Sequence, residues 1–416
     1  MLSLPQQVMP KRVMPKRVLV ALCGGIAAYK VCEVVSTLAK AGFEVRALLT
    51  KAAQQFVTPL TLATLSRHPA YTDQEFWSER QGRPLHIELG EWANLIVIAP
   101  LSANTLAKLS WGAADNLLTN TVLASSAPLL LAPAMNTTMW EQPQVQRNWA
   151  LLQGDARIHS VGPGSGRLAC DAVGAGRMAE PAAILAAVES LLWTGGRRDL
   201  AGRRVLISAG STREHLDPVR FIGNPASGRM GFALAQAARA RGAQVSIVHG
   251  PANPDLIEVA EQAGIECCAI TSAIQMQAAL KTRFIDADLT LMAAAVADVR
   301  PAHCATTKLP KQELPDSLGL EPVADIVADL GAHKRPDQLL VGFAAQTGEI
   351  LEPARDKLQR KGLDAIVANA VDQPERGFGT STNEAIFLNR QGQQQTTGLV
   401  SKLELAHQLF DFLLRS

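Results

Sequence analysis

One arrangement of residues occurs twice in this chain: a basic lead-in, an apolar strand-like run, glycines and then a helical pattern. It appears first at residues 16–30, KRVLVALCGGIAAYK, and again from residue 203, where RRVLISAG ends in Gly210. Gly195, Gly196 and an Arg-Arg pair precede the second copy. The repetition predicts two α/β units, with an N-terminal extension at 1–17, a first domain at 18–196 and a second domain at 197–416.

The first half alternates strand and helix patterns. Continuous apolar runs of the kind found in central parallel strands occur at 18–22, 45–49, 95–99, 129–132 and 157–161. Helical patterns fall between or after them, at 26–40, 103–109 and 184–192. This order predicts a doubly wound α/β domain, whose ligands bind at the carboxyl ends of the strands.

The second half follows the same alternation. Strands are predicted at 205–208, 245–248, 266–270, 289–293, 339–343 and 365–368, and helices at 230–241, 273–282 and 353–360. A hairpin is predicted from 384–388 and 394–400, followed by a last helix that begins at Lys402. The fold class is therefore α/β, with two doubly wound, Rossmann-like domains.

Composition excludes several classes of protein. With 416 residues, 47% hydrophobic and 19% charged, the chain is a globular protein rather than a disordered one. A net charge of +2 gives no electrostatic case for nucleic acid. No apolar run reaches the roughly 18 to 20 residues that span a bilayer, and the first residues lack the apolar core of a signal peptide. We expect a cytoplasmic protein without a membrane segment. The repeated MPKRV allows a start at Met1, Met9 or Met14.

The six cysteines form no CxxC and pair with no histidine at zinc-ligand spacing, so no structural metal is predicted. Five of them fit small buried apolar residues. Cys170 is different because it lies in the glycine-rich run GPGSGRLACDAVGAGRM, which we interpret as a flexible segment that suits a reactive thiol.

Polar and glycine residues follow the predicted strands of the first domain. Gly24 and Gly25 would let backbone amides approach a phosphate at a helix N-terminus, although a tight strand-to-helix turn would need them equally. Ser102, Asn104 and Thr105 follow another strand, and three such residues favour a ligand over capping alone. A GPGSG follows a third strand, but too many glycines come after it for the helix of a dinucleotide fingerprint, so we reject that interpretation.

Residues up to about 190 resemble the flavin-containing cysteine decarboxylases, a flavodoxin-like and homo-oligomeric family. The resemblance is carried by GGIAAYK, HIELGEWAN, SANT at 102–105, PAMNTTMW at 133–140 and ACDAVGAGRM at 169–178. The last two motifs are those of the phosphopantothenoylcysteine decarboxylase branch. One departure is Asn94, where the family has an aspartate.

The resemblance implies FMN as the cofactor. In this family the substrate thiol is oxidised by FMN, and the resulting thiocarbonyl accepts the electrons as CO2 leaves. The implied roles are assistance of the oxidation by His86, binding of the departing carboxylate by Asn136 and proton donation by Cys170. FMN contacts are implied for Gly25, Ile26, Ala27, Thr50, Ser102, Asn104 and Thr105.

In the second domain, the first strand is followed by a long segment that ends in SGRMG. Ser227, Gly228 and Gly231 open a helix whose amides could hold a phosphate, and Arg220 and Arg229 would add charge. A long structural loop is the weaker alternative, since such stretches in compact domains usually have a function. A later strand end, MAAAVADVRP at 292–301, admits close backbone approach, and its aspartate could bind a phosphate-bridging magnesium ion or a ribose.

This half resembles phosphopantothenate–cysteine ligase along nearly its whole length. The matching runs include SAGSTREHLDPVRFIGN, SGRMGFALA, MAAAVADVRP, VGFAAQT and ARDKLQRKGLDAIVAN. The resemblance implies that Asn224 contacts an acyl-nucleotide intermediate and that Lys308 is needed to form it. A CTP site is implied for Met292, Ala293, Ala294, Asp298, Lys308, Ala324, Asp325, Ile326, Val327, Phe343, Lys357 and Lys361, with Asp298 as the Mg²⁺ ligand. Pro310 and Val323-Ala324 depart from the family's usual residues.

The order of the two halves, decarboxylase first and ligase second, resembles the bifunctional coenzyme A biosynthesis proteins of bacteria. It implies ligation of cysteine to 4′-phosphopantothenate with CTP, then decarboxylation to 4′-phosphopantetheine. It also implies a homo-oligomer, with trimeric flavin domains and dimeric ligase domains in a dodecamer. Two alternatives are an FMN-binding regulatory protein without activity, which the three catalytic-type residues disfavour, and a nicotinamide-dependent oxidoreductase, which the missing GxGxxG disfavours.

Overall fold

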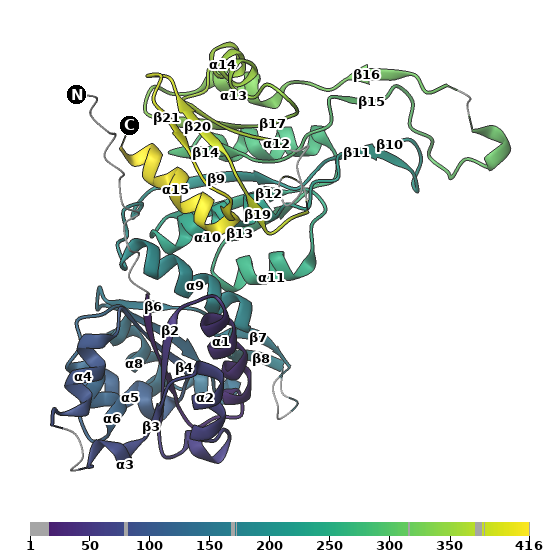
Figure 1. Cartoon of the computed structure of the whole chain (residues 1–416). Helices are drawn as coiled ribbons and strands as arrows, with labels where there is room; N and C mark the ends of the chain where they lie inside the picture. The colour runs from purple at the N-terminus through teal and green to yellow at the C-terminus, as the bar shows by residue number, and fades with distance from the viewer. Residues whose placement is uncertain are drawn as a thin grey trace, which may run out of the picture. The chain divides into compact units, whose positions relative to one another are not determined.

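The structure is a computed structural model that describes residues 16–78, 82–167, 171, 173–314, 317–370, 377 and 379–415. The chain divides into two compact units, Met1–Leu185 and Ala186–Ser416, and each is described by itself (Figure 1). The division falls within helix α9 (Pro181–Thr194), ahead of the glycine pair at which the sequence analysis placed the boundary. Among the described residues, no helix has both the length and the apolar character needed to cross a membrane.

Unit 1 is built on a six-stranded parallel sheet with the order β3-β2-β1-β4-β5-β6. Without the two-residue edge strand β3, the five remaining strands have the order 2-1-3-4-5, which is the flavodoxin-like order that we predicted. All seven residues of β4 are buried, because a central strand is covered by helices on both faces. The bounds are β1 Arg17–Leu22, β2 Glu44–Leu49, β3 Ala70–Tyr71, β4 Leu95–Leu101, β5 Leu129–Pro133 and β6 Ile158–Ser160.

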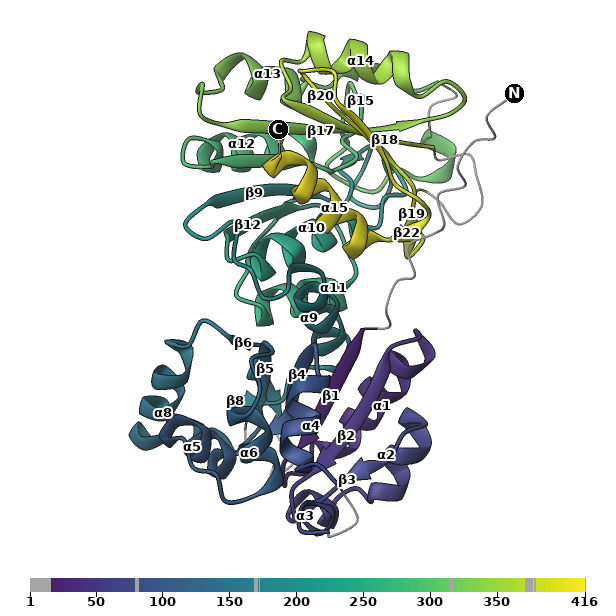
Figure 2. The same cartoon turned by 60° about the vertical axis from the view of Figure 1, so that its left-hand side comes forward.

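Helices cover the sheet of unit 1 on both faces (Figure 2). In α1 the residues Val31, Val34, Val35 and Leu38 recur at helical spacing and are buried, so this face of the helix packs on the sheet. The helices are α1 Ala28–Lys40, α2 Pro59–Ser66, α3 Asp73–Phe76, α4 Leu85–Trp92, α5 Ala103–Trp111, α6 Leu117–Leu123, α7 Thr137–Glu141 and α8 Pro143–Gln153, with a 3-10 turn η1 Ala53–Gln55.

The glycine-rich run that we interpreted as flexible forms an antiparallel hairpin on its described residues. Strand β7 (Gly164–Arg167) pairs with β8 (Val173–Arg177), so that part of the interpretation was wrong. The glycines serve the pairing rather than mobility, since Gly166 and Gly176 take positive φ values of 149° and 123° that other residues rarely adopt. Cys170 falls outside the described residues.

Unit 2 contains an eight-stranded sheet with the order β13-β12-β9-β14-β17-β18-β20-β21. The first six strands are parallel and, numbered along the chain, have the Rossmann order 3-2-1-4-5-6, while β20 and β21 form the predicted antiparallel hairpin. The bounds are β9 Arg204–Ala209, β12 Gln244–His249, β13 Glu266–Ala269, β14 Leu289–Met292, β17 Leu339–Gln346, β18 Ala365–Ala370, β20 Ile386–Asn389 and β21 Gln394–Thr396.

The main core of unit 2 lies between the sheet and helices α10 and α15, where Phe232, Phe387 and Phe410 are fully buried. Helix α15 begins at Lys402, as predicted, and Ser401 caps it by accepting a hydrogen bond from the backbone N–H of Glu404. The helices are α10 Arg229–Ala240, α11 Pro254–Gln262, α12 Ala273–Phe284, α13 Ile326–His333, α14 Leu351–Arg360 and α15 Lys402–Leu414.

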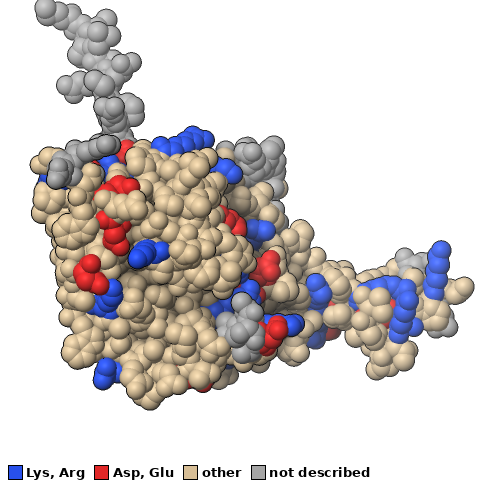
Figure 3. Space-filling model, turned by 90° about the horizontal axis from the view of Figure 1, so that it is seen from below, with Lys and Arg blue, Asp and Glu red and all other residues tan. Residues whose placement is uncertain are grey.

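Two short hairpins extend from the sheet of unit 2 as an arm (Figure 1). Strand β10 (Arg213–His215) pairs with β11 (Phe221–Gly223), and β15 (Val299–Pro301) pairs with β16 (Leu320–Pro322). The 3-10 turn η2 (Lys311–Glu313) lies between β15 and β16 in the chain. A last small pair joins β19 (Thr382–Asn383) to β22 (Val400–Ser401), next to the start of α15. On the face in Figure 3, basic and acidic side chains are intermixed among uncharged ones.

Two candidate active sites

A cavity of about 660 Å³ lies where the strands of unit 1 end. Its lining comes from the turn after β1, the N-terminus of α5, the segment after β5 and the β7–β8 hairpin. Of the residues implied for FMN, Gly25, Ile26, Ala27 and Ser102 line this cavity, and so does the implied catalytic Asn136. The structure therefore brings together five predicted residues from three separate parts of the sequence.

Glycine is required in the turn after β1 because of the space available. A Cβ at Gly24 would lie 2.4 Å from the Cβ of Ala52, far closer than real Cβ atoms approach one another. At Gly25 a Cβ would meet only Pro100, at 3.8 Å. The turn is thus held tightly against the segment after β2, and its backbone reaches the cavity directly at Gly25.

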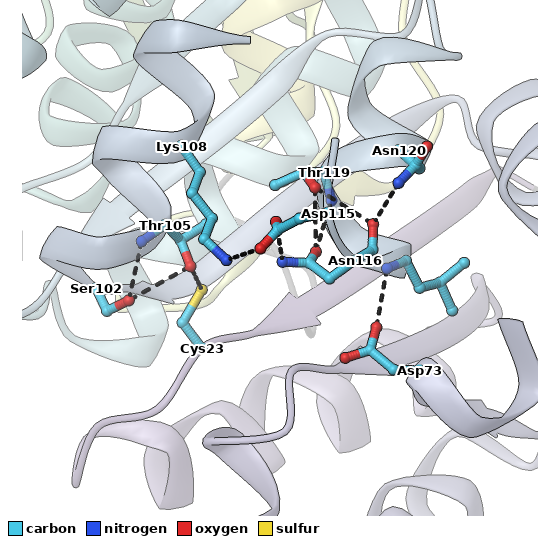
Figure 4. Close-up of polar contacts among 10 residues, drawn as sticks. Cys23, Asp73, Ser102, Thr105, Lys108, Asp115, Asn116, Thr119 and Asn120 are labelled. Atoms are coloured by element: carbon cyan, nitrogen blue, oxygen red, sulfur yellow. Dashed lines mark hydrogen bonds and ion pairs between the residues drawn. The ribbon is translucent and has the colours of Figure 1, made fainter. Parts of the chain in front are cut away.

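Ser102, the first residue of the SANT motif, is the N-cap of α5. Its hydroxyl accepts a hydrogen bond from the backbone N–H of Thr105 at 3.4 Å, and the buried Thr105 hydroxyl accepts one from the Cys23 thiol at 3.2 Å (Figure 4). Burial raises the pKa of the Cys23 thiol, so this cysteine serves packing rather than reactivity. Thr105 therefore supports the cavity from behind and does not line it.

Further along α5, Lys108 contacts Asp115 at 2.5 Å, next to Asn116 (Figure 4). The Asn116 side chain caps α6 by accepting a hydrogen bond from the backbone N–H of Thr119, and Asp73 accepts one from the backbone N–H of Leu117. These contacts fix the end of α5, the start of α6 and the start of α3 to one another.

Asn136 is held by the β7–β8 hairpin and by its own helix. The backbone N–H of Met135 donates to the carbonyl of Gly176 at 2.9 Å, and a Cβ at Gly176 would lie 2.4 Å from the Met135 carbonyl oxygen. The Asn136 side-chain oxygen accepts a hydrogen bond from the backbone N–H of Thr138 at 2.8 Å, which caps α7 and fixes the orientation of the amide.

Three cations line the cavity of unit 1, and each has a carboxylate partner. Lys30 contacts Glu180 at 2.9 Å, and Arg177 contacts the same carboxylate at 2.5 Å. Arg167 pairs with Asp171 at 2.7 Å. The Lys30–Glu180–Arg177 trio also ties α1 to the residues that follow β8.

Three other residues implied for unit 1 are not in the cavity lining. Thr50 donates its hydroxyl to the carbonyl of Leu22 at 3.2 Å, and Asn104 is exposed on α5. His86 lies on α4, which Figure 1 places on the other side of unit 1 from the β7–β8 hairpin. Its ring packs edge-on against Phe76 with centroids 5.4 Å apart, and its buried Nδ1 has no hydrogen-bond partner among the described residues. A buried polar atom left in this way calls for a functional explanation.

The cavity of unit 2, about 410 Å³, lies at the carboxyl ends of β9 and β14. The chain order reverses between these two neighbouring strands, and such a switch point is where ligands bind in open α/β sheets. Most residues implied for CTP line the cavity: Met292, Ala293, Ala294, Asp298, Ala324, Asp325, Ile326, Val327, Phe343 and Lys361.

Gly228 and Gly231 carry the N-terminus of α10 into this cavity. Gly228 has a φ of 79°, which favours glycine, and a Cβ at Gly231 would lie 2.4 Å from the Cβ of Ala209 on β9. The helix therefore starts in direct contact with the sheet, with its N–H groups toward the cavity. Arg229, at the first position of α10, lines the cavity and forms no hydrogen bond or ion pair with any described residue.

The segment after β14 is fixed by hydrogen bonds from neighbouring loops. The backbone N–H of Ala294 donates to the Ser208 hydroxyl at 3.1 Å, and that of Ala295 donates to the carbonyl of Gly210 at 2.9 Å. Asn224 does not line the cavity, but its side-chain N–H₂ donates to the carbonyls of Ala295 and Val296 at 3.3 and 3.4 Å. Asn224 thus holds the lining segment from outside.

The lysines implied for CTP separate into two groups. Lys361 lines the cavity and contacts Asp325 at 2.9 Å. Partial burial acts to raise the pKa of Asp325, but the hydrogen bond and charge of Lys361 outweigh it and lower that pKa below its ordinary value. Lys357, on α14, and Lys308, on the arm between β15 and η2, do not line the cavity.

The backbone beside Lys308 is held by a buried carboxylate. Asp217 accepts a hydrogen bond from the backbone N–H of Leu309 at 3.3 Å and one from the Arg220 guanidinium at 3.0 Å. Desolvation opposes ionisation, but hydrogen bonds from the backbone N–H groups of Arg220, Val219 and Leu309 lower the pKa of Asp217. These contacts fix the arm at the residue after Lys308.

Sequence reasoning missed several lining residues of unit 2. Asn369 is the penultimate residue of β18, Asn383 belongs to β19, and Lys402 begins α15. These three residues lie far from Gly228 and Gly231 in the sequence. They reach the cavity only because the folded chain places β18, β19 and α15 next to it. Of the five cysteines that we expected to be buried, Cys23 is buried and Cys304 is exposed, while the other three, Cys32, Cys267 and Cys268, are half-buried, so the expectation is confirmed only for Cys23.

Comparison with known proteins defines the class. A family model described as Flavoprotein matches residues 9–192, and one described as DNA/pantothenate metabolism flavoprotein C-terminal domain matches residues 200–415. With the two parallel sheets, these matches make the chain a two-domain α/β flavoprotein of pantothenate metabolism. The coenzyme A biosynthesis bifunctional protein CoaBC of Bacillus subtilis (strain 168) is 40% identical over 392 residues, 94% of this chain and 95% of that protein. The chain belongs to this family of bifunctional coenzyme A biosynthesis proteins.

Two further proteins resemble the chain. A cysteine/cysteine sulfinic acid decarboxylase from an unknown prokaryotic organism is 42% identical over 84% of this chain and 96% of its own length. Among solved structures, the FMN binding protein AtHal3 is 41% identical, covering 44% of this chain and 98% of its own, with a TM-score of 0.39.

Proposed function

We propose a division of work between the two units that follows from the family. The chain is a bifunctional enzyme of coenzyme A biosynthesis, with phosphopantothenoylcysteine synthetase and decarboxylase activities. We assign the decarboxylase to the first domain, at 18–196, and the synthetase, which is the ligase, to the second, at 197–416. The observation that carries the assignment is a separate cavity at the strand ends of each unit, lined by part of the residues that the resemblance implies for each activity.

FMN is the cofactor that we assign to the cavity of unit 1. The fit is supported by the cavity of about 660 Å³, by Gly25 with its backbone in the lining, and by the Ser102 cap at the start of α5, since helix N-termini and glycine turns accept a phosphate. When bound there, FMN supplies oxidation of the substrate thiol and the later return of the electrons. We assign Gly25, Ile26, Ala27 and Ser102 as contacts. Thr50, Asn104 and Thr105, for which the resemblance also implies contacts, do not line the cavity, and Thr105 supports Ser102 from behind it.

The protein residues orient the substrate and move protons. We assign the fixed amide of Asn136 to the departing carboxylate, and Cys170, which falls between β7 and β8 in the sequence, to proton donation. His86 lies outside the cavity of its own chain, and its buried Nδ1 needs a partner. We therefore propose that His86 completes the cavity of a neighbouring subunit in a trimer of flavin domains.

In unit 2 the carboxylate of 4′-phosphopantothenate attacks the α-phosphate of CTP, the bond to the β-phosphate breaks, and pyrophosphate leaves. The amine of cysteine then displaces CMP from the acyl-cytidylate. Such a reaction depends on positioning and charge neutralisation rather than on a protein nucleophile. We assign the backbone N–H groups of α10 to phosphate binding, Asn224 to alignment of the segment 292–298, and Lys308 on the arm to the first step.

A magnesium ion is proposed at Asp298. The described residues contain no cluster of three or more His, Cys, Asp or Glu side chains that would bind a metal by themselves. Magnesium bound to nucleotides commonly uses one or two carboxylates together with the phosphates, so the single Asp298 in the lining is a sufficient protein ligand. The arm hairpins are the surface through which we propose that ligase domains pair into dimers.

The test is mass spectrometry of the products formed by the purified protein from 4′-phosphopantothenate, cysteine, CTP and Mg²⁺. We expect 4′-phosphopantetheine together with CO2, CMP and pyrophosphate. Accumulation of phosphopantothenoylcysteine would contradict the decarboxylase assignment alone. A chain that forms no CTP-dependent product would contradict the ligase assignment and favour the regulatory flavoprotein.

A further inference from the structure

Lys402 is a buried cation that the proposed chemistry does not yet use. It is the first residue of α15, its relative exposure is 7%, and it lines the cavity of unit 2. Its ammonium group donates hydrogen bonds to the carbonyls of Gly377 and Thr380 at 3.0 and 2.7 Å. No described carboxylate forms an ion pair with it. Two neutral carbonyls do not cancel a buried positive charge, so this arrangement is electrostatically incomplete.

The surroundings of Lys402 oppose a positive charge. The N-terminus of a helix carries partial positive charge, and Lys402 occupies the first position of α15. The guanidinium of Arg229, which also lines the cavity, adds a second positive charge nearby. Burial, together with this neighbouring charge, lowers the pKa of Lys402 to about 8. An anion bound between the two cations would remove each of these penalties.

On this basis we propose that Lys402 is a substrate-binding residue of the ligase cavity which, together with Arg229, binds the triphosphate of the nucleotide. The inference rests on the proposed ligase function. The triphosphate is favoured because the cavity offers two cations, Arg229 and Lys402, as well as the N–H groups at the start of α10, which is more positive charge than a single phosphate needs. The alternative ligand is the single phosphate of 4′-phosphopantothenate, and the experiment separates the two.

A purely structural role for Lys402 would be to hold the turn at Gly377 and Thr380. The same turn is held independently by the Thr380 hydroxyl, which donates to the carbonyls of Gly377 and Thr382 at 3.2 and 2.8 Å. Thr380→Val therefore loosens this turn without changing the charge in the cavity and is a matched control. Lys281→Met is a second control, because it removes a lysine of unit 2 that pairs with Asp329 outside this cavity.

The experiment measures binding of CTP with Mg²⁺, and separately of 4′-phosphopantothenate, to the full-length protein by calorimetry. We expect Lys402→Met to weaken CTP binding by about tenfold or more, the usual size of a hydrogen-bonded contact to a charged group, and to leave 4′-phosphopantothenate binding within about twofold. Thr380→Val and Lys281→Met should bind CTP like the wild type. Retained binding of 4′-phosphopantothenate verifies that unit 2 of each variant is folded, and decarboxylase activity on phosphopantothenoylcysteine verifies that unit 1 is.

The pH dependence gives a second readout. The other titratable side chains in the lining are Arg229, Asp298, Asp325 and Lys361, and carboxylic acids and guanidinium groups ordinarily titrate far from pH 8. Lys361 keeps the carboxylate of Asp325 beside it. As pH rises from 7 to 9, Lys402 loses its proton, so CTP binding to the wild type should weaken by about tenfold. Lys402→Met should show no such change.

Three outcomes would overturn the inference: wild-type CTP affinity in Lys402→Met, an equal loss in Thr380→Val, or a loss confined to 4′-phosphopantothenate. Failure of the ligase function is a different result, because the wild-type chain would then form no CTP-dependent product.

Discussion

Replacing Gly231 by alanine tests how closely α10 must approach the sheet of unit 2. The new Cβ would lie 2.4 Å from the Cβ of Ala209, 3.0 Å from its Cα and 3.1 Å from the carbonyl oxygen of Ser208. Ordinary contact begins at 3.4 Å, so the start of α10 must move by about 1 Å. Both neighbours belong to a buried central strand and cannot rotate away.

The cost has two parts. Overpacking of a core contact costs about 1–3 kcal/mol, and the better helix propensity of alanine offsets up to about 1 kcal/mol of it, so we expect a net loss of stability near 1–2 kcal/mol. A displacement of about 1 Å in a positioning element can cost about 100-fold in rate. We therefore expect kcat/KM for CTP in the ligase reaction to fall by about that factor, while decarboxylation of added phosphopantothenoylcysteine is unchanged.

The matched control is Gly398→Ala, since a Cβ at Gly398 meets nothing within 4 Å and its φ is not positive. Coupled assay of CMP release and thermal unfolding would be measured on both variants. If Gly231→Ala keeps wild-type kcat/KM, or if Gly398→Ala loses as much, the close approach of α10 to the sheet is not what positions the nucleotide.

Three further predictions concern other parts of the molecule. His86→Asn and Asn136→Asp should each abolish decarboxylation. If His86 serves a neighbouring subunit, trimers assembled from an equal mixture of the two variants should have about a quarter of their sites intact and regain about that share of activity. No recovery of activity in the mixed trimers would refute that proposal. Arg241 is fully buried and pairs with Asp199 and Asp411, so Arg241→Met should lower the free energy of unfolding by about 3–5 kcal/mol in denaturant titrations. A loss below about 1 kcal/mol would show that these ion pairs contribute little to stability. Burial and the charges of Glu261 and Glu266 raise the pKa of Cys267 to about 11, whereas Cys304 is exposed. At pH 8, iodoacetamide should therefore alkylate Cys304 well before Cys267. Equal rates of alkylation, measured by peptide mass spectrometry, would contradict this prediction.

The strands were predictable because burial on both faces makes their sequences continuously apolar. The run 95–99 lies within β4, all of whose residues are buried, and 205–208 lies within β9. Several helices of unit 1 were not predicted, because their sequences do not show a clear helical period. In α2, PLTLATLS intersperses hydroxyl residues with apolar ones, so no apolar face of helical period stands out, and α4 is only eight residues long.

The candidate sites were predictable where one strand end supplies a whole lining segment. Met292 ends β14 and residues 293–298 follow it directly, and all seven line the cavity. The two lysines near the end of α14 were harder to separate, because residues four apart share a helix face: Lys361, the residue after the helix, lines the cavity, whereas Lys357, one turn earlier, does not. Lys402 stands 173 residues after Arg229 in the sequence. Only the packing of α15 beside α10 in the fold brings the two to one cavity.

Both cavities lie at the carboxyl ends of parallel strands, but they differ in whether the cations in their lining have carboxylate partners. In unit 1 the lining cations Lys30, Arg167 and Arg177 all have carboxylate partners. Lys30 and Arg177 share Glu180, so no described cation of this lining is without a carboxylate, which suits a phosphate held mainly by backbone N–H groups. In unit 2 Lys361 is paired with Asp325, whereas Arg229 and Lys402 have no described carboxylate partner. Arg229 and Lys402 are therefore the lining cations for which an anionic ligand would be the first strong partner, which supports the proposal that the triphosphate of the nucleotide binds in unit 2.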